Sequence, residues 1–149
     1  YKKISLKKYK GKHRFLPKIT PDEGSIDWNR KDIEIYNFIR SKSSPYPNAF
    51  TYINEKKLKI KSAKLIKIKF NNNFKNGEIV LILNDKSFVV KVKNGFLLLS
   101  IDDKDFSKLK ENKVFRSTKF KSQMKTIIDR HYKIYPNNLL NNLIINLSK

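Results

Sequence analysis

The sequence predicts a mainly β domain with helices (α+β), organised as a small antiparallel barrel. Between residues 58 and 101, short apolar runs alternate with tight polar turns, a pattern that favours a sheet that closes on itself over an open one. Stretches 33–39 and 120–131 have apolar residues at three- and four-residue spacing, which is typical of amphipathic helices. We expect a basic arm at 1–20, the domain at 21–117 and a helical tail at 118–149.

The length and composition fit one ordinary domain. The chain has 149 residues, 39% of them hydrophobic and none of them cysteine, so it can build a core but no disulfide or thiolate metal site. No apolar run approaches the roughly 20 residues of a membrane span, and the basic start lacks the apolar core of a signal peptide. We expect a cytoplasmic protein with no membrane partner. Because the chain starts at Tyr1 within a lysine-rich run, we also expect a segment before it.

The charge is strongly positive and has two interpretations. Thirty-four Lys and Arg against thirteen Asp and Glu leave a formal charge of +21, which attracts polyanions such as nucleic acid. However, 29 of the 34 basic residues are Lys, and Asn and Ile are abundant, as a genome rich in A and T would encode. Bidentate recognition of phosphate or guanine favours Arg. The charge is therefore either functional or compositional.

The first residues form a basic segment without acids. Its basic residues are Lys2, Lys3, Lys7, Lys8, Lys10, Lys12, Arg14 and Lys18. Gly11 and Pro17 disfavour regular structure, so we expect an extended arm or linker. His13 has no acid beside it to orient its ring, and we expect it at the surface.

The stretch from Pro21 to Tyr52 has the most ordered pattern in the chain. Residues 21–24 have the composition of a β-turn, with Gly24 free to take a positive φ. Asn29 is expected to cap the following helix, and Asp32 suits its positive end. The expected apolar face consists of Ile33, Ile35, Tyr36, Phe38 and Ile39.

A loop with two prolines follows this helix. Pro45 and Pro47 fix their own φ and push the preceding residues out of the α region, so the helix must end and the chain must turn. Asn48 stands where a left-handed residue is often needed.

These residues together resemble the start of the C-terminal domain of the formyltransferase family. The matching residues are Ile26-Asp27-Trp28, Glu34-Ile35, Ile39-Arg40, Pro45-Tyr46-Pro47-Asn48-Ala49-Phe50-Thr51, Leu58-Lys59-Ile60 and Ala63. The resemblance covers residues 21–101. The family usually has Gly where this chain has Asn48, and Asn is the most natural replacement for Gly at such a position.

The resemblance implies a fold and two functions. The family domain is an OB-like barrel, and OB barrels commonly bind single strands or tRNA. It follows an N-terminal catalytic domain that uses 10-formyltetrahydrofolate as cofactor. The family includes methionyl-tRNA formyltransferase, in which a basic linker lies along the tRNA, and enzymes that formylate amino sugars on nucleotide carriers. In the first case initiator tRNA is a partner. In the second the domain is structural or dimer-forming, without nucleic acid. A free-standing RNA-binding protein of ribosomal type is a third interpretation.

A strand with a ladder of lysines is expected over 58–70. Leu58, Ile60 and Ser62 alternate with Lys57, Lys59 and Lys61, and this two-residue period predicts a half-buried strand. The phase slips across 63–65, which indicates a bulge or bend there. Beyond it, Ile66, Ile68 and Phe70 are expected to face inward, and Lys67 and Lys69 outward. Like charges in a row favour an anion lying across them.

Three further short strands are expected at 78–83, 87–92 and 96–101. The turns are Asn84-Asp85 and Asn94-Gly95, the second being the strongest hairpin signal in the chain. In 87–92 one face is expected to be core and the other partly wet. Residues 114–118 are expected to add a last strand.

The remaining residues predict an acidic turn and a helical tail. Asp102, Asp103, Asp105 and Glu111 lack the spacing and glycine of an EF-hand, so no metal site is expected. Phe120, Met124, Ile127, Ile128 and His131 mark one helix, with His131 packed on its apolar stripe. Leu139, Leu140, Leu143, Ile144 and Leu147 mark another after the break at 135–137. The tail could cover a barrel end, dock on another domain or make a dimer contact.

No catalytic residue is expected in this chain. In the family, the catalytic Asn, His and Asp and a His-x-Ser-Leu-Leu-Pro loop belong to the N-terminal domain, and neither His13 nor His131 is followed by anything similar. The chain has only four glycines and no Gly-x-Ser-x-Gly, so phosphate loops and nucleophile elbows are absent. The expected nucleic-acid-binding residues are Lys10, Lys12, Arg14, Lys18, Arg40, Lys42, Lys57, Lys59, Lys61, Lys67 and Lys69.

Overall fold

The structure is a computed structural model that describes residues 20–70, 73–83, 86–107 and 109–134. Its elements are η1 (Pro21–Glu23), α1 (Asp32–Lys42), β1 (Ala49–Ile53), β2 (Lys56–Ile66), β3 (Ile79–Ile82), β4 (Ser87–Val92), β5 (Gly95–Ile101), α2 (Asp103–Phe106) and α3 (Phe120–Ile134). The arm before residue 20, the Asn84-Asp85 turn and the second tail helix lie outside the described residues.

The strands form one antiparallel five-stranded sheet in the order β1-β2-β5-β4-β3. This confirms the α+β class and agrees with an OB-like architecture. The edge strands β1 and β3 are joined through the segment after α2, because Val114 bridges Glu78 and Arg116 bridges Tyr52. The sheet is therefore not a continuously closed barrel, and the last strand expected at 114–118 is reduced to these two bridges.

One core fills the space between the sheet and α1. Trp28 is fully buried, donates its indole N–H to Thr51 Oγ1 at 3.0 Å and stacks on Phe115 with ring centroids 5.4 Å apart. Ile35 and Ile39 of α1 are buried in the same cluster. The expectation for Ile33 was wrong, because its side chain is 45% exposed. Two residues correspond to about 200° around a helix, so a helix docked through Ile35 turns Ile33 to the opposite side.

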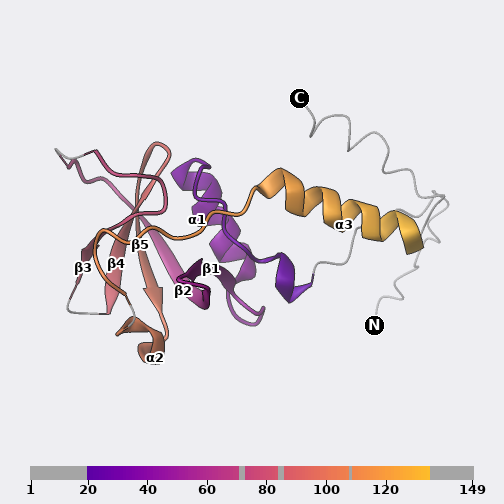
Figure 1. The fold of residues 1–149 in the computed structure, drawn as a ribbon, viewed down its shortest axis with the longest axis horizontal. Coiled ribbons are helices and arrows are strands. Elements are labelled where there is room, and N and C mark those ends of the chain that lie inside the picture. Colours follow the sequence, from indigo (N-terminus) through magenta and orange to yellow (C-terminus); the bar gives the residue numbers. More distant parts are fainter. Residues whose placement is uncertain (1–19, 71–72, 84–85, 108, 135–149) are drawn as a thin grey trace, which may run out of the picture.

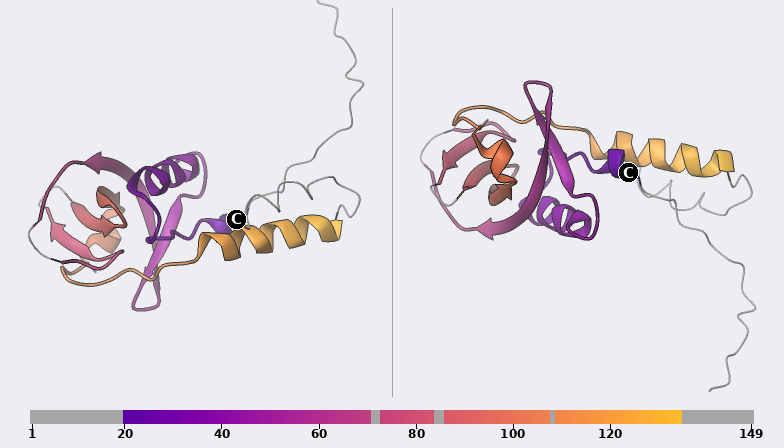
Figure 2. Two further views of the ribbon diagram at one scale, coloured as in Figure 1. Left: turned by 90° about the horizontal axis from the view of Figure 1, so that it is seen from above. Right: turned by 90° about the horizontal axis from the view of Figure 1, so that it is seen from below.

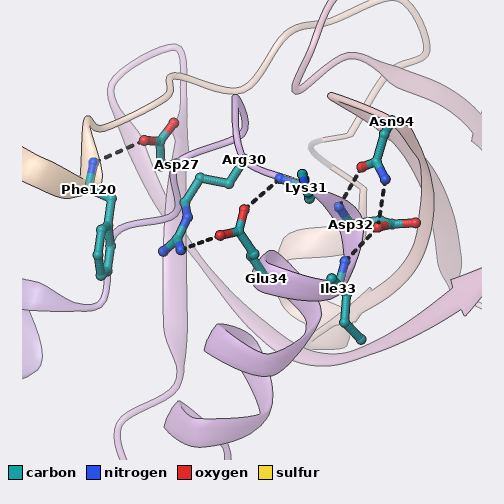
Figure 3. A network of polar contacts seen from close by, with 8 residues as sticks. All are labelled: Asp27, Arg30, Lys31, Asp32, Ile33, Glu34, Asn94 and Phe120. Carbon is teal, nitrogen blue, oxygen red and sulfur yellow. Dashed lines mark hydrogen bonds and ion pairs between the residues drawn. The ribbon is translucent and has the colours of Figure 1, made fainter. Parts of the chain in front are cut away.

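The start of α1 also differs from the expectation. Lys31, not Asn29, is the N-cap, and its N–H donates to Glu34 Oε2 at 3.0 Å. The helix is joined to the β4–β5 turn, since the Asp32 N–H donates to Asn94 Oδ1 at 2.9 Å and Asn94 Nδ2 donates to Asp32 Oδ1 at 3.1 Å (Figure 3). Asn29 instead donates through Nδ2 to Ser117 Oγ at 3.3 Å. A tertiary contact therefore displaced the helix start by a few residues.

The two turns of the proline-rich stretch pack against each other. Asn48 has φ 66°, which confirms the expected left-handed residue. Gly24 has φ −94°, so it does not use its freedom to take a positive φ. Its lack of a side chain is still needed, because a Cβ there would lie 3.2 Å from Asn48 O. The Phe50 N–H donates to Gly24 O at 2.8 Å, and this hydrogen bond links the two turns.

The irregularity expected in β2 is present but lies earlier than expected. The register shifts between Ile60 and Ser62, where Lys61 is the additional residue. The shift turns Ser62 outward and brings Ala63, rather than Ser62, into the core. β2 ends at Ile66, and Ile68 is 44% exposed, so its expected inward position is wrong.

The outer side of β4 is partly wet, as expected, with Lys91 half-buried and Lys93 exposed, but it also carries an apolar cluster. Val80, Val89 and Phe96 form a second buried cluster, which we call the outer cluster. The segment after β2 covers it with Phe70 and Phe74, and the Phe70 and Phe96 ring centroids are 4.8 Å apart. The sequence did not predict this cover over the apolar part of the face, because it comes from a loop outside β4 and β5.

The hairpin expected at Asn94-Gly95 exists with its turn one residue earlier. Val92 pairs with Gly95, so Lys93 and Asn94 form the turn and Gly95 opens β5.

The helix α3 extends away from the sheet, beyond α1 (Figure 1). Its expected apolar stripe is confirmed by Ile127 and His131, which are buried. Asp27 Oδ2 accepts from the Phe120 N–H at 2.9 Å, and Gln123 Nε2 donates to Ser25 O at 2.8 Å. The base of α3 is thus fastened to the segment between η1 and α1.

Candidate nucleic-acid interface

The hairpin of β1 and β2 carries aromatic and cationic side chains on its outer face. Phe50 is paired with Lys59, and Tyr52 with Lys57. Residues opposite each other in antiparallel strands share one face of the sheet. The tip of this hairpin protrudes on the side away from α1 (Figure 2). We call the set Phe50, Tyr52, Lys57, Lys59 and Arg116 the cation–aromatic face.

Direct contacts organise this face. Lys57 Nζ lies 3.8 Å from the centroid of the Phe50 ring, and the Arg116 guanidinium lies 4.6 Å from that of Tyr52. The two rings are perpendicular, with centroids 5.6 Å apart. Phe50 is buried whereas Tyr52 is half-buried, so Tyr52 is the ring that a ligand can reach. Cations held over rings keep their charge at the surface with little freedom to move.

Acidic neighbours neutralise this face only in part. Lys57 Nζ is 3.8 Å from Asp22 Oδ1, and Arg116 Nη1 is 3.2 Å from Glu55 Oε2. Both carboxylates are largely exposed, and such surface pairs are weak and screened by salt. Lys59 has no ion-pair partner among the residues that the structure describes. The face can therefore exchange weak internal pairs for phosphate contacts.

The structure assembles only part of the expected ladder. Lys57, Lys59 and Lys61 are all exposed on β2, and Lys61 Nζ is 3.8 Å from Asp102 Oδ1. Lys67 and Lys69 are exposed but follow the end of β2, so they are not part of the same strand face. Lys10, Lys12, Arg14 and Lys18 lie outside the described residues.

The remaining two expected residues lie at the end of α1. Arg40 is exposed, and its guanidinium is 5.2 Å from the Tyr36 ring. Lys42 is half-buried beside the Phe38 ring, at 5.9 Å. Burial lowers the pKa of the Lys42 ammonium, and the charge of Glu23 offsets only part of this effect.

Lys42 lines a groove of about 450 Å³ between η1 and the loop after α1. We call it the loop groove. Its other lining residues are Thr20, Pro21, Gly24, Ser41, Tyr46, Pro47 and Asn48. The groove is therefore built from the turn and the proline loop that carry the family resemblance.

The sequence reasoning missed Arg116 and Tyr52. Arg116 reaches the face because its segment bridges Tyr52, with the Arg116 N–H donating to Tyr52 O at 2.9 Å. The expected strand at 114–118 placed Arg116 in the sheet, but pairing with β1 cannot be read from periodicity.

Comparison with known proteins identifies the family. The family model described as Formyl transferase, C-terminal domain, matches residues 18–113. The chain belongs to this family. The matched residues of this formyl transferase C-terminal domain include α1, both turns and the whole sheet, and they exclude α3.

Curated relatives agree with this assignment. Methionyl-tRNA formyltransferase of Mycoplasma capricolum subsp. capricolum is 35% identical over 86 residues, covering 58% of this chain and 27% of the relative. The enzyme of the same name from Mycoplasma mycoides subsp. mycoides is 38% identical over 77 residues, covering 52% and 24%. The domain thus spans about a quarter of the length of these relatives.

A relative with another name matches a shorter segment. The bifunctional polymyxin resistance protein ArnA of Wigglesworthia glossinidia brevipalpis is 41% identical over 51 residues, which are 34% of this chain and 8% of the relative.

Other kinds of site find no support in the described part of the domain. No group of three or more His, Asp and Glu gathers there to hold a metal. None of the described helices is long and apolar enough to cross a membrane.

Proposed function

We propose that this domain is the non-catalytic C-terminal part of a methionyl-tRNA formyltransferase-like enzyme, where it binds and positions tRNA. An N-terminal domain would carry 10-formyltetrahydrofolate and the chemistry of formyl transfer. The observation that carries the proposal is the cation–aromatic face, in which Lys57 and Arg116 are held over rings and Lys59 has no ion-pair partner among the described residues.

The chemistry of this face suits a phosphate backbone. Lys57 and Lys59 provide regularly spaced point charges, since alternate residues on one face of a strand repeat about every 6.8 Å. Contacts of this kind position a nucleic acid but do not read its sequence. We therefore assign the domain the role of holding tRNA, while selection among tRNAs belongs to other parts of the enzyme.

Titration with initiator tRNA at several salt concentrations tests the proposal. Each phosphate contact steepens the log–log salt dependence of the affinity by about 0.7 to 0.9. The triple variant Lys57→Gln, Lys59→Gln and Lys61→Gln should bind more weakly, and its slope should be smaller by about 2 to 3.

A second triple variant serves as the matched control. Lys93→Gln, Lys110→Gln and Lys113→Gln remove the same charge at exposed positions outside β2. If both triple variants lose the same affinity and slope, only net charge matters and the face is not the site. If wild type does not bind tRNA at low salt, the proposal is wrong.

The family resemblance leaves a second function open, and the matched relatives carry more than one name. In this alternative the domain is a structural or dimer-forming part of a sugar-nucleotide N-formyltransferase, and the lysines reflect composition. The domain would then not bind tRNA even at low salt. Sedimentation velocity would show that it self-associates. A monomeric domain that binds tRNA would exclude this alternative.

A further inference from the structure

We propose that the loop groove holds one unpaired nucleotide of the bound RNA, with Lys42 on its phosphate and Tyr46 against its base. This inference rests on the proposed function and adds a second, chemically distinct subsite to it. The cation–aromatic face would track the backbone, and the groove would take a single exposed base.

A half-buried cation lines the groove. Lys42 is half-buried and forms no ion pair among the described residues; its ammonium lies 5.9 Å from the Phe38 ring, and the charge of Glu23 offsets only part of the cost of its burial. Removing an ammonium from water is unfavourable unless a counter-charge compensates it in full. An anion in the groove would supply that counter-charge.

An exposed aromatic ring also lines the groove. Tyr46 is 63% exposed and lies between two prolines, and within the described residues its ring has no aromatic or cationic partner. Its backbone is held by the turn, where the Tyr46 N–H donates to Ser43 O at 3.1 Å. An exposed ring on a rigid loop is a suitable stacking surface for a base of any kind.

The groove adjoins the cation–aromatic face. Lys57 Nζ is 3.8 Å from Oδ1 of Asp22, a residue of η1. Pro21, which precedes Asp22 in the chain, lines the groove. A Cβ on Gly24 would lie only 3.4 Å from Phe50 Cδ1. The two surfaces are thus separated by the width of η1, so one RNA strand can contact both.

The hydroxyl and amide groups at the groove suit a nucleotide as well. Thr20, Ser41 and Asn48 line it beside the apolar walls of Pro21 and Pro47. The volume of about 450 Å³ falls in the range of small-molecule sites. A mixed lining with one cation and one ring fits a phosphate joined to a flat base better than it fits an aliphatic chain.

The test measures binding of a short single-stranded oligoadenylate and of a blunt-ended RNA duplex by fluorescence anisotropy, using the whole chain. Tyr46→Ala should weaken oligoadenylate binding by about fivefold or more, which is the loss typical of one stacked base. Tyr46→Phe should retain the affinity, and Tyr46→Ala should leave duplex binding unchanged. Lys42→Gln should weaken oligoadenylate binding and reduce its salt slope by about 0.7, whereas Lys93→Gln should not.

Several results would overturn the inference. Unchanged oligoadenylate affinity for Tyr46→Ala, or an equal loss for duplex, would show that no base stacks there. Binding of duplex but not of oligoadenylate by wild type would overturn this inference alone, and absence of both would overturn the proposed function too. If an oligoglutamate peptide displaces oligoadenylate from wild type and its binding depends on Tyr46, the occupant is an acidic peptide. Equal urea midpoints for Tyr46→Ala and wild type show that folding is intact.

Discussion

At the scale of single residues, Asn48 joins the helix to the sheet. It has φ 66°, and its N–H donates to Lys42 O at 2.8 Å, which satisfies a carbonyl at the end of α1. A side chain with a Cβ is disfavoured in this conformation, with Asn the best tolerated after Gly. The position therefore selects a residue type through backbone geometry.

This geometry predicts a specific pattern of stability. Asn48→Ala should reduce the free energy of unfolding by about 1 kcal/mol, because Ala cannot adopt the left-handed region at low cost. Asn48→Gly should be as stable as wild type or more stable. Urea denaturation measures both, and an Ala variant as stable as the Gly variant would contradict the explanation.

The buried indole of Trp28 depends on one hydroxyl. Thr51 is fully buried and accepts the indole N–H at 3.0 Å. Thr51→Val keeps the shape but leaves that N–H unpaired, so the free energy of unfolding should fall by about 1 to 3 kcal/mol. Thr51→Ser retains the hydroxyl and should lose less. Urea unfolding followed by Trp28 fluorescence measures both; equal losses would mean that packing, not the hydrogen bond, matters.

At the scale of elements, α3 is tied to η1 by an ion pair. Arg130 Nη1 contacts Glu23 Oε1, and Glu23 Oε2 accepts from the Thr20 N–H at 2.6 Å. Burial of Glu23 opposes its ionisation, but the bonds from Arg130 and Thr20 outweigh this and lower the pKa of its carboxyl. Because the pKa of Glu23 is lower in the folded state, its ionisation stabilises the fold at pH values above the ordinary pKa of Glu. This stabilisation is lost as the pH falls through the lowered pKa of the folded state.

The pH dependence of Glu23→Gln follows from this sign. At pH near 7 the variant should be less stable than wild type by about 1 kcal/mol, because Arg130 remains partly hydrated. The difference should shrink as the pH falls from about 5 to about 3. Urea midpoints across this range measure it. Glu55→Gln, which alters an exposed pair with Arg116, is the control and should change stability little at any pH. A difference for Glu23→Gln that grows on acidification would contradict the assignment.

At the scale of the whole molecule, positive charge dominates. The formal charge is +21, and such an excess destabilises the compact state by self-repulsion. Raising NaCl from about 0.05 M to about 0.5 M shortens the Debye length severalfold and screens this repulsion. The Tm should therefore rise by several degrees.

Differential scanning calorimetry measures this effect. The variant Lys57→Gln, Lys59→Gln and Lys61→Gln should show a smaller rise with salt, because it carries less repulsion. A Tm that falls with salt would mean that the ion pairs of the surface outweigh its repulsion.

Local patterns explain which parts of the structure could be predicted. The helix at α1, the strand at β4 and the left-handed Asn48 follow from periodicity and backbone sterics, which act over a few neighbouring residues. The cover over the outer cluster could not be predicted, because Phe70 and Phe74 come from a loop that packs across β5. The helix start at Asp32 depends on Asn94 from a distant turn.

Some features of the candidate site could likewise be predicted from local patterns, and others could not. Residue type and alternation alone predict the family motif, the excess of positive charge and the lysines on β2. Which charges contact rings and carboxylates follows from the folded structure alone. It moved Lys67 and Lys69 off the strand, brought Arg116 to Tyr52 and made a groove from two turns. The physical reason is that strand pairing and bulges place residues that are far apart in the chain on one surface, and no local periodicity records that pairing.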